Sequence, residues 1–150
     1  MKTILLALTM LAGATAWCAK PEVIPELKQW TDGTGCYTRS AATRVVIPET
    51  ACDSLAQYAT AFAAELGVPC ARVKLNANWW NFFAEKPAKG DIILRGPCCK
   101  PCTKTQTKKE DAERYTIEVT ADNITIMGHT PLAAYWGTRT VMQVFNAQSG

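Results

Sequence analysis

The densest group of chemically reactive side chains in the sequence is a set of three cysteines, Cys98, Cys99 and Cys102, of which the last two have Cys-x-x-Cys spacing. That spacing occurs in thiol redox sites and in zinc sites, where His129, the only histidine, is a conceivable fourth ligand. A redox pair needs a helix N-terminus to lower the pKa of its thiol, but the neighbouring prolines, threonines and lysines favour an exposed loop. Structural disulfides are therefore favoured over a zinc or redox site, and we expect no metal and no cofactor.

A run of aromatic residues occupies the middle of the chain, at Trp79, Trp80, Phe82 and Phe83. Sugars bind to proteins by stacking on aromatic rings, so this run is a candidate carbohydrate-binding surface. Four large rings in so short a stretch also bury a large apolar area when they pack. Contact with the core or with a partner is the favoured interpretation, and sugar binding is the alternative.

The residues that could carry out hydrolysis are not arranged for it. The acidic residues at 110, 111 and 113 lie in a lysine-rich stretch, which is typical of a solvated charge run rather than of an acid-base pair. His129 stands between Gly128 and Thr130, where we expect a turn residue. The sequence also has no Gly-x-Ser-x-Gly elbow for a nucleophilic serine. It predicts no catalytic residue.

The first 18 residues have the composition of a secretory leader, with Lys2 followed by an apolar run that ends in small residues. The run is too short to span a bilayer, and no transmembrane helix is expected. Cleavage fits after Ala16 or after Cys18, so residues 1–18 are predicted to be a signal peptide and residues 19–150 one exported domain, in the periplasm, at the cell surface or secreted. Acylation of Cys18 is less favoured, because Trp17 stands where a lipoprotein box has a small residue.

The charge and the cysteine count of the predicted mature chain restrict its partners and its compartment. Removing the leader takes away Lys2 and no acidic residue, so the formal net charge falls from +3 to about +2. This charge is too small to indicate a nucleic-acid partner. Six of the seven cysteines remain, and an even number in an exported chain indicates disulfides. The disulfide candidates are Cys36, Cys52, Cys70, Cys98, Cys99 and Cys102, with their pairing left open.

Two helices are expected to position these residues. Between residues 51 and 66, apolar side chains recur at spacings of three and four, with Thr50 as the expected N-cap and Gly67 as the stop. The second helix begins at Thr130 and Pro131 and carries apolar residues on almost every side. Because a small sheet covers only one side of such a helix, we expect a second packing partner. The candidates for that interface are Tyr135, Trp136, Met142 and Phe145.

The remaining segments with a clear pattern are strands. Short aliphatic runs at 44–47, 71–75 and 91–94 predict strands, and alternation across 115–120 and 124–126 predicts an antiparallel hairpin. The order of strand, helix, strands, hairpin and helix favours an α+β fold in which two helices pack on one face of a mostly antiparallel sheet. No internal repeat is visible.

Four segments, at residues 23–27, 90–94, 115–128 and 134–143, are distinctive when taken together. They resemble successive landmarks of the N-terminal, non-catalytic domain of β-N-acetylhexosaminidases of glycoside hydrolase family 20, and the resemblance covers roughly residues 22–146. The last segment is similar to that domain's closing pattern, in which an aromatic residue and Gly precede Thr and then Gln. Ala133 stands where the family usually has Gly, and the cysteine-rich stretch is not part of the pattern.

The resemblance implies a function that belongs to a larger protein. In family 20 the catalytic Asp-Glu pair and the sugar-binding residues lie on a (β/α)8 barrel that follows this domain, and the substrate's own acetamido group attacks the anomeric carbon. None of those positions occurs in this sequence, so the chain alone is not expected to be an enzyme. Related domains precede barrels in other glycosidase families, such as the α-glucuronidases, so the substrate stays open.

Two hypotheses follow. In the first, the chain is the accessory N-terminal domain of an exported β-N-acetylhexosaminidase acting on glycans that contain N-acetylhexosamine, and it braces the catalytic barrel. In the second, it is a free-standing carbohydrate-binding or cell-surface module with the same fold, whose partner is a glycan. A reading frame that continues into barrel motifs favours the first hypothesis, and a stop codon after Gly150 favours the second.

Overall fold

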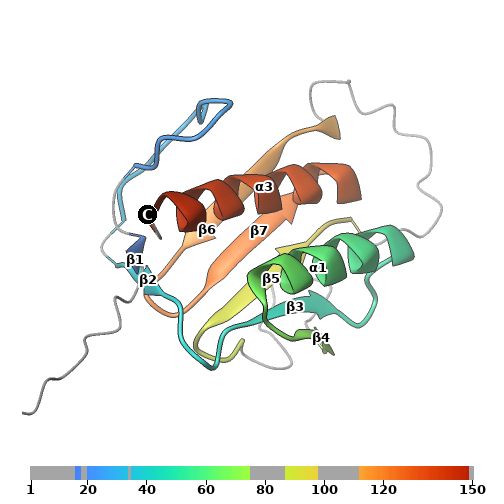
Figure 1. Cartoon of the computed structure of the whole chain (residues 1–150). Helices are drawn as coiled ribbons and strands as arrows, with labels where there is room; N and C mark the ends of the chain where they lie inside the picture. The colour runs from blue at the N-terminus through green and yellow to red at the C-terminus, as the bar shows by residue number, and fades with distance from the viewer. Residues whose placement is uncertain (1–15, 18–19, 34, 75–86, 98–111, 149–150) are drawn as a thin grey trace, which may run out of the picture.

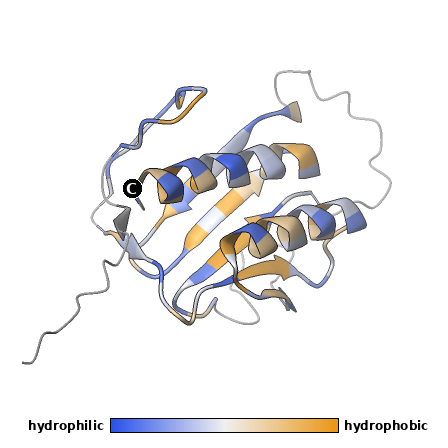
Figure 2. Cartoon of the chain, in the orientation of Figure 1, coloured by the Kyte–Doolittle hydropathy of each residue, from blue (hydrophilic) through white to orange (hydrophobic). Residues whose placement is uncertain are grey.

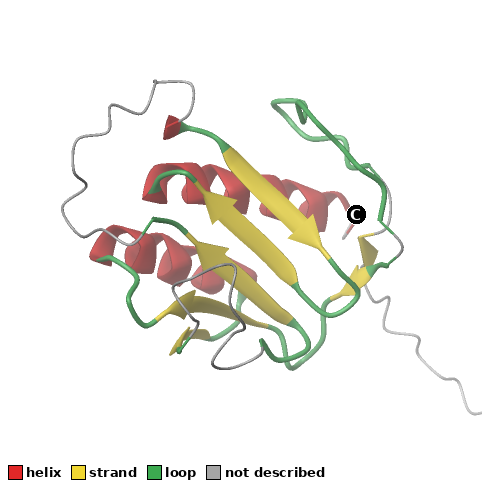
Figure 3. Cartoon of the chain, turned by 180° about the vertical axis from the view of Figure 1, so that it is seen from behind, coloured by secondary structure: helices red, strands yellow, loops and turns green. Residues whose placement is uncertain are grey.

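The computed structural model describes residues 16–17, 20–33, 35–74, 87–97 and 112–148. In chain order the elements are β1 (Ala16–Trp17), β2 (Tyr37–Thr38), β3 (Arg44–Pro48), α1 (Asp53–Leu66), β4 (Cys70–Val73), β5 (Asp91–Arg95), β6 (Tyr115–Val119), β7 (Ile124–Gly128) and α3 (Pro131–Gln148). Strands β3 to β7 form one sheet, and β1 and β2 form a separate pair. Both helices lie on one face of the five-stranded sheet, seen from the helix side in Figure 1 and from the opposite side in Figure 3.

The two predicted helices are confirmed, and three of their ends show how the helices are stabilised. The N-cap of α1 is Cys52 rather than the expected Thr50, and it makes no side-chain cap hydrogen bond. Gly67 ends α1 in the left-handed conformation, with φ 67°, which glycine adopts without steric strain. At the start of α3, the Thr130 Oγ1 accepts the N–H of Ala133 at 3.0 Å, as expected of an N-cap threonine.

The sheet has the order β4-β3-β5-β7-β6. Strand β3 pairs in parallel with β4 and with β5, and β5 pairs in parallel with β7, whereas β6 and β7 are antiparallel. The expectation of a mostly antiparallel sheet is therefore wrong, because three of these four pairs are parallel. The α+β class, the two helices on one face and the hairpin of β6 and β7 agree with the sequence analysis.

The path of the chain explains the parallel pairs. Helix α1 connects β3 to β4 across the face of the sheet, so β4 returns in the same direction as β3. The hairpin then places β7, not β6, beside β5. The apolar runs at 45–47 and 92–94 are continuous and wholly buried, as is typical of parallel strands covered on both faces. Figure 2 shows the hydrophobic stretches of β5 and β7 behind the helices.

The main core fills the space between the sheet and the helices. Its buried side chains include Leu55 and Phe62 from α1 and Val141 and Phe145 from α3, packed against aliphatic residues of the central strands. Burying each large side chain stabilises the domain by about 1.5–3 kcal/mol. The core therefore fixes both helices against the sheet.

Helix α3 approaches β7 closely because small residues stand between them. A Cβ atom at Gly137 would lie 2.5 Å from the Cγ2 atom of Ile126, and one at Gly128 would overlap the backbone nitrogen of Ala134. Only glycine fits at either position without a shift of the helix. The Gly137 of the distinctive closing segment thus sets the distance between α3 and the sheet.

Strand β1 lies within the segment expected to be the signal peptide. Ala16 stands opposite Thr38, and Trp17 stands opposite Tyr37, in an antiparallel pair with β2. These two residues of the expected leader are therefore paired with the domain in the structure.

Candidate functional site

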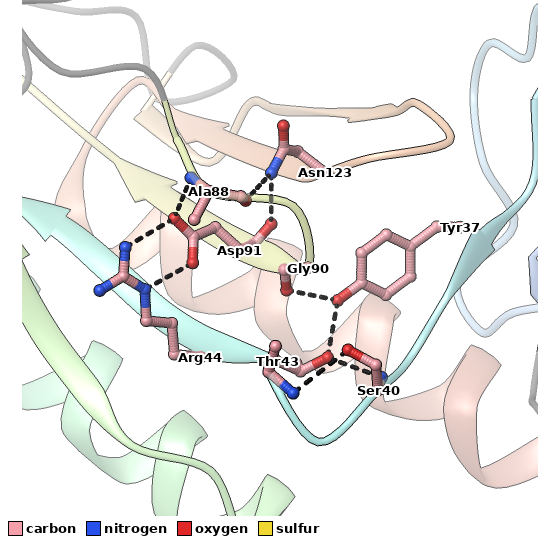
Figure 4. Close-up of polar contacts among 9 residues, drawn as sticks. Tyr37, Ser40, Thr43, Arg44, Ala88, Gly90, Asp91 and Asn123 are labelled. Carbon is pink, nitrogen blue, oxygen red and sulfur yellow. Dashed lines mark hydrogen bonds and ion pairs between the residues drawn. The ribbon is translucent and has the colours of Figure 1, made fainter.

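A cluster of polar groups lies at the end of the sheet where β3 and β5 begin, and Figure 4 shows its contacts. Its centre is Asp91, whose side chain is only 1% exposed. Arg44 donates from Nε to Oδ1 at 2.6 Å and from Nη2 to Oδ2 at 3.1 Å, and the backbone N–H of Ala88 donates to Oδ2 at 2.8 Å. Both carboxylate oxygens are thus engaged by donors, which makes Asp91 a structural anchor rather than an acid or base for a substrate.

The Asp91 cluster extends to the segment before β3 through Tyr37. The Tyr37 hydroxyl donates to the carbonyl of Gly90 at 2.7 Å and lies 3.3 Å from Thr43 Oγ1. Burial raises the pKa of Tyr37 above its ordinary value of 10.0, and the hydrogen bond with Thr43 opposes this shift. The hydroxyl therefore stays protonated and remains a donor at neutral pH.

The hairpin turn is joined to the same cluster by Asn123. Its Nδ2 donates to the carbonyl of Ala88 at 2.7 Å and lies 3.5 Å from the carbonyl of Asp91. The N–H of Gly90 donates to the carbonyl of Asp122 at 2.7 Å. The turn between β6 and β7 is thereby fixed to the start of β5, so the cluster holds three separate segments in register.

The described part of the chain holds no group of three or more His, Cys, Asp and Glu side chains placed to bind a metal ion. The exposed His129 donates its backbone N–H to the carbonyl of Arg114 at 2.9 Å, which agrees with a turn position. Cys98, Cys99 and Cys102 lie outside the described residues, so their predicted disulfides stay a prediction.

The other cysteines fall into two groups. Cys36 is disulfide-bonded, whereas the disulfide candidates Cys52 and Cys70 form no disulfide in the structure. Burial raises the pKa of Cys70, which lowers the fraction of reactive thiolate, although hydrogen bonding to Thr60 opposes the shift. Cys70 therefore does not have the environment of an activated nucleophile.

Of the residues that the sequence predicts to bind a partner, the structure describes those on α3 but not the aromatic run. Trp79, Trp80, Phe82 and Phe83 lie outside the described residues, so the sugar-binding alternative stays a prediction.

The four interface candidates on α3 point to different surroundings. Trp136 is 44% exposed, Tyr135 and Met142 are half-buried, and Phe145 is buried. The Phe145 ring lies 6.3 Å from that of Tyr37, and the guanidinium of Arg39 lies 5.5 Å above it. Phe145 therefore belongs to the core, while Trp136 is available for a contact.

Tyr135 connects the two helices beside Trp136. Its ring centroid lies 5.1 Å from that of Tyr58 on α1 and 5.3 Å from that of Trp136. The guanidinium of Arg139 lies 4.9 Å from the Tyr135 ring and forms a 2.6 Å ion pair with Glu65 of α1. These contacts restrict the side chains next to Trp136, so this surface is held in shape before any partner binds.

Sequence reasoning missed two exposed residues. Among the described residues, Ile24, Leu132 and Trp136 are the exposed large hydrophobic side chains, at 86%, 44% and 44%. The position of Leu132, one helical turn before Trp136, was a usable signal. No local signal marks Ile24 as exposed, because its environment depends on a residue far along the chain.

The family model described as glycosyl hydrolase family 20, domain 2, matches residues 20–150. The chain belongs to this family. The match includes the segment around Ile24, the Asp91 cluster and the whole of α3, so the contacts of these three parts lie within the family domain.

Two individual proteins are similar to the chain. A lacto-N-biosidase of Bifidobacterium bifidum is 30% identical over 128 residues, which span 83% of this chain and 10% of that protein. A solved structure of a GH138 enzyme targeting pectin rhamnogalacturonan II is 13% identical, with a TM-score of 0.47, over 72% of this chain and 14% of that one. The chain thus spans about a tenth of the length of the curated relative that it matches.

Among the described residues, no helix combines the length and the apolar content needed to cross a membrane.

Proposed function

We propose that the chain is the accessory domain of an exported β-N-acetylhexosaminidase and that it braces the catalytic barrel through the outer side of α3. The observation that carries this proposal is the exposed pair of Leu132 and Trp136 on a helix whose opposite side is fully packed. Single exposed apolar residues are ordinary, but two large ones a helical turn apart form a continuous surface.

Family membership indicates the nature of the partner. A domain of this family normally accompanies a catalytic barrel, and the curated relative is a much longer protein. Covering about 100 Å² of apolar surface on Trp136 and its neighbours stabilises an interface by roughly 2.5 kcal/mol. That contribution, on side chains already restricted by Tyr135 and Arg139, supports a bracing role for this face.

The chemistry of the parent protein is proposed from the resemblance of the distinctive segments to β-N-acetylhexosaminidases. Its substrates are then glycans that contain N-acetylhexosamine, cleaved on the barrel and not on this domain. The purified chain is expected to release no nitrophenol from a nitrophenyl N-acetylglucosaminide. Turnover above buffer that survives control purifications would contradict the assignment.

The bracing role is tested by producing the catalytic domain with and without this domain attached. We expect the attached form to unfold at a higher temperature and to keep its hydrolytic activity longer on heating. Trp136→Asp in the joined protein should lower both values toward those of the isolated catalytic domain. Equal thermal stability with and without this domain would show that it does not brace the barrel.

Export is a second part of the proposal, and it is supported by the leader-like composition of residues 1–18. The intact mass of the exported protein distinguishes the two cleavage sites. Cleavage after Ala16 keeps Trp17 opposite Tyr37, whereas cleavage after Cys18 removes all of β1. A full-length mass in the cytoplasmic fraction would rule export out.

A further inference from the structure

One side chain bonds the N-terminal segment to α3. The Gln143 Oε1 accepts the backbone N–H of Ile24 at 2.8 Å, and its Nε2 donates to the carbonyl of Ile24 at 2.8 Å. A neighbouring β-strand makes the same two bonds to a residue that it pairs with. Gln143 therefore holds the backbone of Ile24 as a strand would, although the two residues are 119 positions apart.

The residues beside Ile24 are also fixed. Val23 is buried in the core, and Leu27 packs against it. On the solvent side, Lys20 and Glu26 form an ion pair at 3.2 Å. Although Val23 is buried, the next side chain, Ile24, is 86% exposed. An exposed isoleucine on a mobile segment needs no explanation, but this one is held in position.

The position at which Ile24 is held continues the exposed line on α3. At 3.6 residues per turn, Leu132, Trp136 and Gln143 fall within about 40° of one another around the helix axis. They extend over roughly 17 Å along it at 1.5 Å per residue. Since Gln143 binds Ile24, the isoleucine lies at the C-terminal end of this line. We call Leu132, Trp136 and Ile24 the outer ridge.

We propose that Ile24 is a contact residue in the interface with the catalytic domain and that Gln143 is the positioning residue that holds it there. This inference rests on the proposed function, which supplies the catalytic domain of the same protein as the occupant of the ridge. The family match, and the curated relative of which the aligned residues span only 10%, indicate this occupant.

The composition of the ridge favours a protein occupant over a glycan. Two of its three side chains are aliphatic, and sugars bind by stacking on aromatic rings with convergent polar groups around them. A rigid line of apolar side chains suits the packed surface of another domain, where the cost of ordering side chains has already been met. Gln143 thus connects α3 to a contact residue supplied by a distant segment.

The test uses the chain and the catalytic domain as separate polypeptides, with their dissociation constant as the first measurement. We expect Ile24→Asp to weaken binding at least 10-fold and Gln143→Met about 5-fold. Thr116→Asp, on an exposed position of β6, and Gln57→Met, on an exposed position of α1, are the matched controls and should bind as the wild type does.

Hydrogen exchange of the Ile24 amide is the second measurement, because it reports on positioning independently of binding. The amide should be protected in the wild type and in the Gln57→Met control, and should exchange freely in Gln143→Met. Loss of protection without any loss of binding would overturn the positioning role of Gln143.

The outcomes separate this inference from the proposed function. If the wild-type chain does not bind the catalytic domain, the proposed function fails and this inference fails with it. If Trp136→Asp weakens binding while Ile24→Asp does not, the proposed function stands and this inference is overturned. Weakening by both substitutions, with both controls unchanged, supports both proposals.

Discussion

The inner and outer sides of α3 are built from different kinds of residue. Toward the sheet, Ala133, Ala134 and Gly137 are small and buried, and at Gly137 even a methyl group would collide with Ile126. Away from the sheet, Leu132 and Trp136 expose large apolar side chains. The inner side sets the distance between helix and sheet and so determines stability. The outer side adds little to the stability of the domain alone and is available for association, so substitutions on the two sides should separate the two properties.

The largest effect is expected for Gly137→Val on the inner side. The added side chain has no room beside Ile126, so α3 must move away from the sheet, at a cost of about 3 kcal/mol. Urea unfolding followed by circular dichroism measures the change. Ala147→Val, at an exposed position of the same helix, is the control and should cost less than about 1 kcal/mol. Equal stability of the two variants would mean that α3 is not closely packed on β7.

The Asp91 cluster should behave like the inner side, because it holds the strands on which α3 packs. Asp91→Asn keeps the shape but removes the charge and turns an amide nitrogen toward a donor, which should cost about 2 kcal/mol. Asp122→Asn is the control, since that carboxylate is exposed and pairs with Lys89 at 3.6 Å. A cost at Asp91 no greater than at Asp122 would show that the cluster does not anchor the sheet.

A smaller effect, with a distinctive pH dependence, is expected for Tyr37→Phe. The substitution leaves the Gly90 carbonyl without its hydroxyl donor and should cost about 1–2 kcal/mol at neutral pH. In the wild type, burial raises the pKa of Tyr37, so its hydroxyl ionises at a lower pH in the unfolded state than in the folded state. The stabilisation from Tyr37 is therefore fully present below pH 10.0 and is lost as the pH rises through the folded-state pKa.

Unfolding curves of the wild type and Tyr37→Phe between neutral and strongly alkaline pH measure this difference. The two curves should converge as the pH rises above the ordinary tyrosine pKa. Tyr58→Phe is the matched control, because the contact between the Tyr58 and Tyr135 rings survives loss of the hydroxyl. A stability difference between wild type and Tyr37→Phe that stays constant across this range would contradict the assigned role of the hydroxyl.

The smallest effect on folding is expected on the outer side. The isolated domain should self-associate in size-exclusion chromatography and bind a hydrophobic dye, and Trp136→Asp should reduce both while changing the free energy of unfolding by about 0.5 kcal/mol or less. Met142→Lys is less informative, because Met142 is half-buried and packs against the core. A wild-type domain that is monomeric and binds no dye would favour the free-standing module.

Sequence reasoning succeeded where a short stretch of residues decides the structure. The spacing of apolar residues predicted α1, Thr130 and Gly67 marked helix ends, and strict alternation predicted the hairpin of β6 and β7. It failed for strand direction, because a short apolar run such as 92–94 predicts a strand without identifying its neighbours in the sheet. The continuity of the run, in place of alternation, was the available signal for the parallel arrangement.

The candidate site was predicted less completely, for a related reason. Trp136 was identified because the apolar pattern of its own helix lacks a partner on one side. The bonds of Arg44 to Asp91 and of Gln143 to Ile24 join residues 47 and 119 positions apart. No local pattern records such contacts, so the anchored carboxylate and the outward isoleucine emerged only from the folded chain.

The bond between Gln143 and Ile24 also determines how this domain is carried in a longer polypeptide. It joins the first described segment after β1 to the last helix, so the incoming and outgoing ends of the domain meet on the same side. A domain of this kind is suited to modular insertion, because both connections leave together and the neighbouring parts need no long spacer.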